Sequence, residues 1–197
     1  MTDMSLTQIM FRDAHKEDAR EIARLYQMAA GGVADVIWDG LRIGDEDIVS
    51  SGARRFAREG TDVSFENCAL AEIRGRTVGL LHAYPMAADP DFDSATVDPV
   101  IRPYTELEED QSYYIAGVAL HADFRDRGIG TKMLKLAELR AMTRGLAKVS
   151  LIAFQDNAAS VRLYERLGYG VVDSRAIVPH PFIRCSGQAL LMVKRLA

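Results

Sequence analysis

Residues Tyr113–Arg144 read YYIAGVALHADFRDRGIGTKMLKLAELRAMTR and carry the strongest signal of how this chain folds. Residues 113–120 are mostly apolar, which predicts a buried strand. Residues 128–144 have the spacing of an amphipathic helix. The two elements are joined through the sequence Arg125-Asp126-Arg127-Gly128-Ile129-Gly130. A strand that runs into a helix through two glycines predicts a site where the backbone approaches a ligand closely.

This turn is predicted to bind an anion such as a phosphate or a pyrophosphate. The first N–H groups of a helix have no partner within it and lie at the positive end of its dipole. Arg125, Arg127 and Lys132 add positive charge around them. Two common phosphate motifs do not fit, because Met133 stands where the dinucleotide motif needs a small residue, and Thr131 follows the second glycine where a P-loop needs lysine.

The flanking sequence predicts a mixed sheet of parallel and antiparallel strands, covered by helices. Hydrophobic periodicity and the turn residues glycine, proline and asparagine set the bounds of the elements. We expect a single domain over 1–197. The predicted strands are 7–12, 68–73, 77–83, 113–120, 148–154, 169–178 and 188–196, and the predicted helices are 15–30, 35–41, 45–59, 128–144 and 157–167.

The composition is that of a globular domain. Of the 197 residues, 48% are hydrophobic and 26% are charged, which is sufficient for a core without disulfides. No apolar run reaches the roughly 18 residues of a membrane span, and the N-terminus has no signal-peptide pattern. We therefore expect a cytoplasmic protein, with Cys68 and Cys185 as reduced thiols. The net charge of −4 disfavours nucleic acid as a partner.

Charge is distributed unevenly along the chain. Residues 85–112 hold eight carboxylates and one basic side chain, whereas residues 125–148 hold seven basic side chains and two acidic ones. The first segment suits a cation and the second an anion, although two solvated faces would give the same pattern. The segment 85–110 also contains four prolines and little periodicity, which is typical of a functional or disordered loop.

These motifs resemble those of the GNAT superfamily of N-acetyltransferases, which use acetyl-CoA. Arg125-x-x-Gly128-x-Gly130 after a buried strand is similar to the family's cofactor signature, and residues 157–169, NAASVRLYERLGY, are similar to its second motif. The order of the predicted elements agrees with the family along nearly the whole chain. The resemblance implies an α/β fold of the α+β type, with a mixed, mostly antiparallel central sheet, a splayed central strand pair and flanking helices.

The resemblance implies acetyl-CoA as acyl donor, and no metal. In the family, the strand before the signature pairs with the pantetheine arm, and the amides after it hold the pyrophosphate. Asp126 departs from the usual glycine and sets an acid beside the pyrophosphate, and Ala122 replaces a frequent proline. The predicted cofactor-binding residues are Val118, Ala119, Leu120, Arg125, Asp126, Arg127, Gly128, Ile129, Gly130, Thr131, Asn157 and Ser160.

The resemblance makes Tyr164 the predicted general acid. Attack of an amine on a thioester generates an oxyanion, which a fixed backbone N–H can stabilise. The departing thiolate needs a proton, which a phenol of pKa about 10 can supply. The alternative interpretation is a core aromatic, because Tyr164 lies three residues after Val161 and three before Leu167.

The acidic segment offers candidates for a general base. A lysine-like amine is neutral in only about one part in 10³ at pH 7, so a base would accelerate its reaction. Glu109 is the first candidate, with a solvated loop as the alternative, and His121 is a second candidate that the cofactor would cover. The predicted substrate-binding residues are Tyr26, Trp38 and Tyr113. The Gly31-Gly32 break would lie near one wall of the acceptor cleft, and residues 178–182 would form the other wall. Trp38 could equally be a packing residue.

The leading interpretation is transfer of an acetyl group from acetyl-CoA to a primary amine by direct attack. The amine would belong to a small molecule or to a peptide or protein N-terminus. Two other classes remain open, namely a catalytically inactive acyl-CoA-binding module and a protein-interaction module that uses the acidic loop. Tyr164 in register with Asn157 favours the enzyme. The sequence does not identify the acceptor or the length of the acyl chain. It also leaves the oligomeric state open, with a homodimer as one option.

Overall fold

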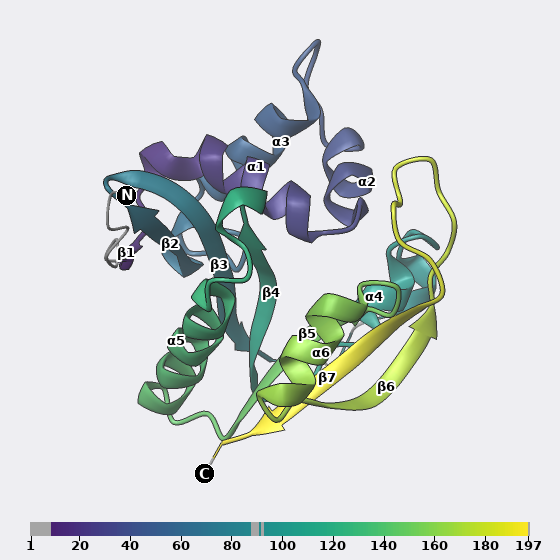
Figure 1. Ribbon diagram of the computed structural model, residues 1–197. Helices are drawn as coiled ribbons and strands as arrows, with labels where there is room; N and C mark the ends of the chain where they lie inside the picture. Colours follow the sequence, from purple (N-terminus) through teal and green to yellow (C-terminus); the bar gives the residue numbers. More distant parts are fainter. Residues whose placement is uncertain (1–8, 88–90, 92, 197) are drawn as a thin grey trace.

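The computed structural model describes residues 9–87, 91 and 93–196. At its centre lies a seven-stranded sheet with the strand order β1-β2-β3-β4-β5-β7-β6 (Figure 1). All neighbouring strands are antiparallel except β4 and β5, which are parallel. This confirms the predicted mixed sheet. The strands are β1 (Ile9–Asp13), β2 (Cys68–Ile73), β3 (Arg76–Met86), β4 (Ser112–Leu120), β5 (Lys148–Phe154), β6 (Gly170–Ala176) and β7 (Gln188–Arg195).

Helices cover both faces of the sheet. One core cluster packs α5 and α6 against one face, and a second packs α1, α2 and α3 against β2, β3 and β4 on the other face. A third cluster lies under α4, against β5 and β7. The helices are α1 (Ala19–Ala29), α2 (Val33–Asp39), α3 (Ile48–Phe56), α4 (Arg102–Thr105), α5 (Ile129–Thr143) and α6 (Ala158–Arg166). Among the described residues, no helix is both long and apolar enough to cross a bilayer.

The central strands β4 and β5 are paired over only three positions. Tyr113, Tyr114 and Ile115 pair with residues 149–151, and beyond them the two strands separate. On its other edge β4 stays paired with β3 as far as Leu120, with a bulge at Ala116. The gap between β4 and β5 is the splayed strand pair that the resemblance implies.

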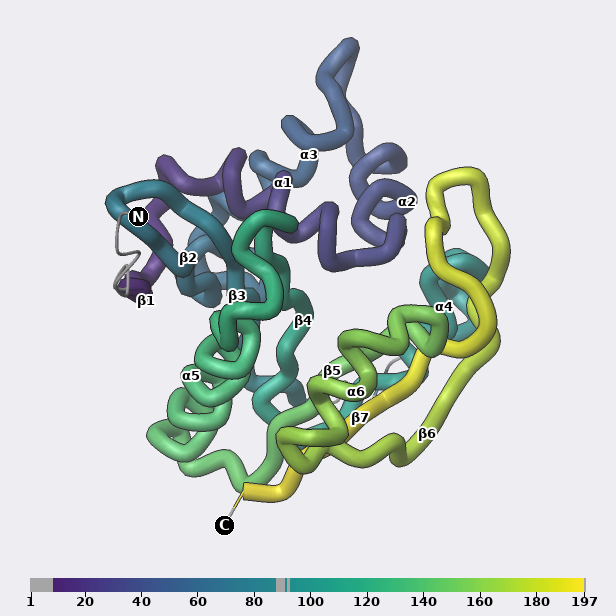
Figure 2. Tube along the Cα trace, viewed as in Figure 1, coloured from purple at the N-terminus to yellow at the C-terminus, as the bar shows by residue number. Residues whose placement is uncertain are grey.

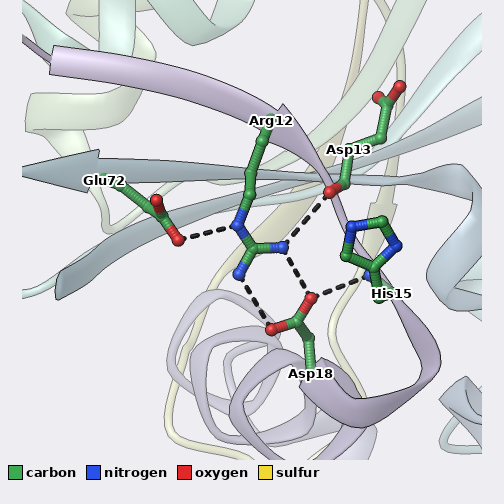
Figure 3. A network of polar contacts seen from close by, with 5 residues as sticks. All are labelled: Arg12, Asp13, His15, Asp18 and Glu72. Carbon is green, nitrogen blue, oxygen red and sulfur yellow. Dashed lines mark hydrogen bonds and ion pairs between the residues drawn. The ribbon is translucent and has the colours of Figure 1, made fainter. Parts of the chain in front are cut away.

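A polar network ties the first strand to the first helix (Figure 3). The guanidinium of Arg12 donates two hydrogen bonds to the carboxylate of Asp18, at 2.7 and 2.9 Å, and a third to Glu72, at 2.7 Å. Asp18 also accepts from the backbone N–H of His15 at 2.8 Å. The hydrogen bonds from Arg12 are the main cause that lowers the pKa of Asp18. These contacts fix where α1 begins relative to β1 and β2.

Several elements differ from their predicted bounds. The first helix begins at Ala19, because residues 16–18 form a separate 3-10 turn. Strand β3 continues through Pro85 to Met86, opposite Ser112, and the proline-rich segment contains the one-turn helix α4. Positions 7 and 8 of the first predicted strand lie outside the described residues. The predicted bounds of β2 and β5 are confirmed.

Candidate active site

A cavity of about 500 Å³ opens where β4 and β5 separate. Its walls come from three stretches of sequence that the fold brings together, 118–120, 125–131 and 157–164. All of the predicted cofactor-binding residues line it except Arg127, whose guanidinium lies 5.6 Å from the centre of the Phe124 ring. The predicted acid Tyr164 lines it too. In the described part of the chain, no group of three or more His, Cys, Asp or Glu side chains could hold a metal ion.

One end of the cavity is the N-terminus of α5. Gly128 precedes the helix with φ 73°, a left-handed conformation that glycine adopts without steric cost. The first helical hydrogen bond runs from Lys132 N–H to the carbonyl of Gly128 at 3.2 Å, so the N–H groups before it have no partner within the helix. Asp126, at the usual glycine position of the signature, also takes a left-handed φ of 57°. This geometry suits a bound anion.

Tyr164 reaches the cavity from α6. The helix begins at Asn157, whose side-chain oxygen accepts a hydrogen bond from the N–H of Ser160 at 3.2 Å. The Tyr164 ring packs against Tyr169, with 6.2 Å between their centroids. Burial raises the pKa of Tyr164 to about 12, against a smaller opposing effect of its hydrogen bond with Ser160. Its hydroxyl is therefore protonated at neutral pH and can donate a proton.

Apolar side chains that the sequence analysis missed complete the cavity walls. Met28 and Ala29 come from the end of α1, and Ile152 and Phe154 from β5. Strand alternation could not reveal Ile152 and Phe154 as cavity residues, because it does not show where β4 separates from β5. A Cβ atom at Gly31 would lie 2.7 Å from the Phe154 ring, so the break after α1 packs directly against the cavity wall.

The connection between β6 and β7 closes over this same break. In Figure 2 the yellow loop rises beside α2. The backbone N–H of Arg184 donates to the carbonyl of Gly31 at 2.8 Å. Its guanidinium pairs with Asp35 at 2.6 Å, a carboxylate that is only 3% exposed. Within the predicted wall 178–182, the carbonyl oxygen of Phe182 would lie 1.9 Å from a Cβ atom at Gly32, so this wall lies against the Gly31-Gly32 break.

None of the five residues predicted for the acceptor side, which are Tyr26, Trp38, Glu109, Tyr113 and His121, lines the cavity. Trp38 is 2% exposed and packs in the core beneath α2, as its packing interpretation requires. Tyr113 is 1% exposed and points to the α5 face, where Arg144 lies over its ring. Glu109 pairs with Lys148 at the first residue of β5. Since the cavity lies at the other ends of β4 and β5, Glu109 is held away from it.

Tyr26 lies beside the gap and belongs to an aromatic group that the sequence analysis missed. A Cβ atom at Gly117 would lie 2.9 Å from the Tyr26 ring. We call Tyr26, His82, Tyr84 and Tyr114 the tyrosine cluster. Successive ring centroids are 5.5, 5.3 and 5.7 Å apart. The available sequence signal was Tyr84 just after one predicted strand and Tyr114 within another, but only the strand register places the two residues opposite each other.

Burial governs the ionisation of the tyrosine cluster. It raises the pKa of Tyr26 to about 12 and lowers the pKa of His82 to about 4. It also raises the pKa of Tyr84 and of Tyr114, and the negative charge of Glu108 adds to both shifts. All three hydroxyls are therefore protonated and His82 is neutral at physiological pH.

The sequence profile of the acetyltransferase (GNAT) family matches residues 46–169, more than half of the chain. The chain belongs to this family, which confirms the resemblance. An acetyltransferase of Pectobacterium atrosepticum is 40% identical over 62 residues, 32% of this chain and 43% of that protein. A mycothiol acetyltransferase of Corynebacterium aurimucosum is 34% identical over 64 residues, 32% of this chain and 20% of that protein. The aligned part spans less than half the length of each of these relatives.

Solved structures share the fold. An N-acetyltransferase from Staphylococcus aureus Mu50 has a TM-score of 0.63 and 18% identity, over 94% of this chain and 100% of that one. A putative acetyltransferase from Salmonella typhimurium, solved with its cofactor acetyl-CoA, has a TM-score of 0.61 and 18% identity, over 96% of this chain and 95% of that one. The expected fold class is thereby confirmed.

Proposed function

We propose that this protein transfers an acetyl group from acetyl-CoA to a primary amine by direct attack. The observation that carries the proposal is the cavity between β4 and β5, lined by eleven of the twelve predicted cofactor-binding residues and by Tyr164. Membership of the acetyltransferase (GNAT) family and the curated acetyltransferases that it matches support the same reaction. The amine belongs to a small molecule or to the N-terminus of a peptide or protein.

Each part of the cavity has a role in this proposal. The free amides at the start of α5 bind the pyrophosphate, and the open edge of β4 at Val118–Leu120 pairs with the pantetheine arm. A backbone N–H of β4 stabilises the oxyanion that forms when the amine attacks the thioester. Tyr164 then protonates the departing thiolate. The hydroxyl of Tyr164 gives this chain a proton donor for transfer, which favours the enzyme over a module that only binds acyl-CoA.

Cofactor binding is tested first by thermal unfolding with acetyl-CoA, CoA, NAD and ATP. Acetyl-CoA and CoA at about 100 times Kd should add about 2.7 kcal/mol and raise Tm by about 5–11 °C, and NAD and ATP should not. Gly128→Glu should abolish the shift, because it places a carboxylate at the anion site. Gly145→Glu is the matched control, since Gly145 has the same left-handed φ of 72° and open space around it, at the other end of α5. Loss of the shift in both variants would contradict the assignment.

Transfer is tested by measuring CoA release from acetyl-CoA across a panel of amines. Tyr164→Phe should lower kcat by about 100-fold and leave the affinity for acetyl-CoA unchanged, because the ring keeps its packing against Tyr169. An unchanged kcat would remove Tyr164 from the mechanism. Acetyl-CoA binding without CoA release for any amine would favour the inactive binding module instead.

A further inference from the structure

The cofactor cavity is lined from both faces of the sheet. The charged side chains that line it in the described part of the chain are Arg125, Asp126 and Arg166. They come from the turn before α5 and from α6, and both helices pack on one face. Met28 and Ala29 reach the cavity from α1, on the face that α1, α2 and α3 cover. We call this second face the α1–α3 face.

The strand β5 adds two apolar side chains on the α1–α3 face. Leu151 and Ala153 belong to the core under α5 and α6, so strand alternation turns Ile152 and Phe154 to the opposite face. Both of these side chains line the cavity. The Phe154 ring packs edge-on against Tyr104, with 6.2 Å between the two centroids. The ring is therefore held in place before any ligand binds.

The apolar surface on this side of the cavity is left uncovered by the rest of the described chain. We call Met28, Ala29, Ile152 and Phe154 the apolar wall. Met28 is 46% exposed although it lines a cavity, and Ile152 and Phe154 are only partly buried. Apolar surface that stays uncovered inside a cavity is typical of a site for an apolar group of a ligand. In the proposed reaction the phosphates and the pantetheine arm lie against α5 and β4, which leaves the apolar wall to the acceptor.

The apolar wall favours an amine that is neutral near pH 7. A charged group that enters apolar surroundings loses its hydration, which is unfavourable unless an opposite charge compensates. Asp126 lies on the side of α5, and Asp35, beside the break after α1, is already paired with Arg184 at 2.6 Å. An α-amine is neutral in about one part in ten at pH 7, and a lysine-like amine in only about one part in 10³. The wall therefore suits an α-amine better than a lysine-like one.

We propose that the acceptor is an α-amine whose α-carbon carries an apolar side chain, and that this side chain binds against Met28, Ile152 and Phe154. This inference rests on the proposed function and adds the class of acceptor to it. The bound side chain holds the neutral nitrogen beside the thioester. The nitrogen forms the C–N bond as the C–S bond breaks, and Tyr164 protonates the sulfur. The proton that the nitrogen loses returns to Tyr164 through water.

The test measures kcat/KM for CoA release at pH 7 with glycinamide, leucinamide and argininamide, which share an α-amine. Burial of the four carbons that leucinamide adds to glycinamide should raise kcat/KM by about 100-fold. Argininamide should gain little, because its guanidinium would meet the apolar wall. n-Butylamine has four carbons but a lysine-like amine, so it should react about 100-fold more slowly than leucinamide.

An amino acid derivative and the N-terminus of a polypeptide share this chemistry, and a tetrapeptide that begins with leucine distinguishes them. A higher kcat/KM for the tetrapeptide than for leucinamide would assign a polypeptide acceptor. A lower value would assign a small molecule. Both results agree with the inference, because both acceptors present an α-amine beside an apolar side chain.

Met28→Glu should change which amide is preferred. The new carboxylate should lower kcat/KM for leucinamide by about 10-fold and raise it for argininamide by about 2–5-fold. Met28→Leu, which keeps the wall apolar, should retain the wild-type order. Met142→Glu is the matched control, because Met142 is 48% exposed on α5 and lies outside the cavity lining, and it should also keep that order.

Two results would overturn the inference while leaving the proposed function intact. One is CoA release with equal kcat/KM for glycinamide and leucinamide. The other is a change in Met28→Glu that is the same for all three amides, since this would mean that the wall does not contact the acceptor's side chain. Absence of CoA release with every amine would instead contradict the proposed function, and the inference with it.

Discussion

Asp126 should weaken the binding of acetyl-CoA, and its replacement should strengthen it by a predictable amount. Asp126 lines the cavity just before the free amides of α5 and holds a left-handed φ of 57°. Asparagine tolerates this conformation nearly as well as aspartate, so Asp126→Asn removes the charge and little else. Asp126→Gly removes both the charge and the backbone strain.

The size of the effect follows from Coulomb's law and screening. Two unit charges about 8 Å apart in water interact by about 0.5 kcal/mol. The Debye length is about 8 Å at 0.15 M salt and about 30 Å at 0.01 M, which leaves about 0.2 and 0.4 kcal/mol per phosphate charge. For the two charges of a pyrophosphate, Asp126→Asn should lower Kd by about twofold at 0.15 M salt and about fourfold at 0.01 M.

Isothermal titration calorimetry with acetyl-CoA at the two salt concentrations measures this difference. Asp123→Asn is the control, because Asp123 lies three residues earlier and outside the cavity lining. Asp126→Gly should bind as Asp126→Asn does and should also raise Tm by about 2 °C, since relief of the left-handed strain outweighs the entropy of glycine. An equal gain at both salt concentrations, or none at 0.01 M, would refute the electrostatic argument.

Two further predictions concern stability. Gly32→Ala should lower the free energy of unfolding by about 2–4 kcal/mol and Tm by about 4–16 °C, because its Cβ would lie 1.9 Å from the carbonyl oxygen of Phe182. The control is Gly60→Ala, with φ 65° and open space around it, which should lose only about 1 kcal/mol of stability. Equal losses in the two variants would exclude the clash. Asp18→Asn should cost about 1 kcal/mol at pH 7. Because Arg12 lowers the folded pKa of Asp18, its contribution is present above the unfolded pKa of about 3.9 and is lost as pH falls through the lower folded value. Chemical unfolding of both proteins from pH 7 to pH 2 should therefore show the difference disappear in acid, and a constant difference would contradict the ion-pair explanation.

The cofactor side of the site was predictable because short, continuous segments of the chain build it. Gly128 is the N-cap of α5, Gly130 is the second residue of that helix, and Asn157 caps α6 within its own motif. The backbone that would contact the cofactor belongs to those same residues. Local conformational preferences, such as the left-handed φ at Gly128, can be inferred from residue type without knowing the tertiary structure.

The tyrosine cluster was not predictable, because it depends on which face of the sheet each side chain takes. Tyr113 and Tyr114 are adjacent and of the same type, yet one packs under α5 and the other joins the tyrosine cluster. Because side chains alternate between the two faces of a strand, the two tyrosines must lie on opposite faces, but alternation does not show which face each one takes. The position of Glu109 was likewise not predictable, because its partner Lys148 is distant in sequence.

The gap between β4 and β5 explains why both sides of the site meet there. Over Tyr113–Ile115, β4 is paired on both edges, and the sheet there separates the α5 face from the α1–α3 face. Beyond Ile115 the edge of β4 that faces β5 has no strand partner in the part of the chain that the structure describes, and its backbone groups need other hydrogen-bond partners. A ligand with amide groups along its length, as in the pantetheine arm, can satisfy that edge from one face. In the proposed reaction, an amine that approaches from the face of the tyrosine cluster would reach the thioester without crossing the ladder, as direct attack requires.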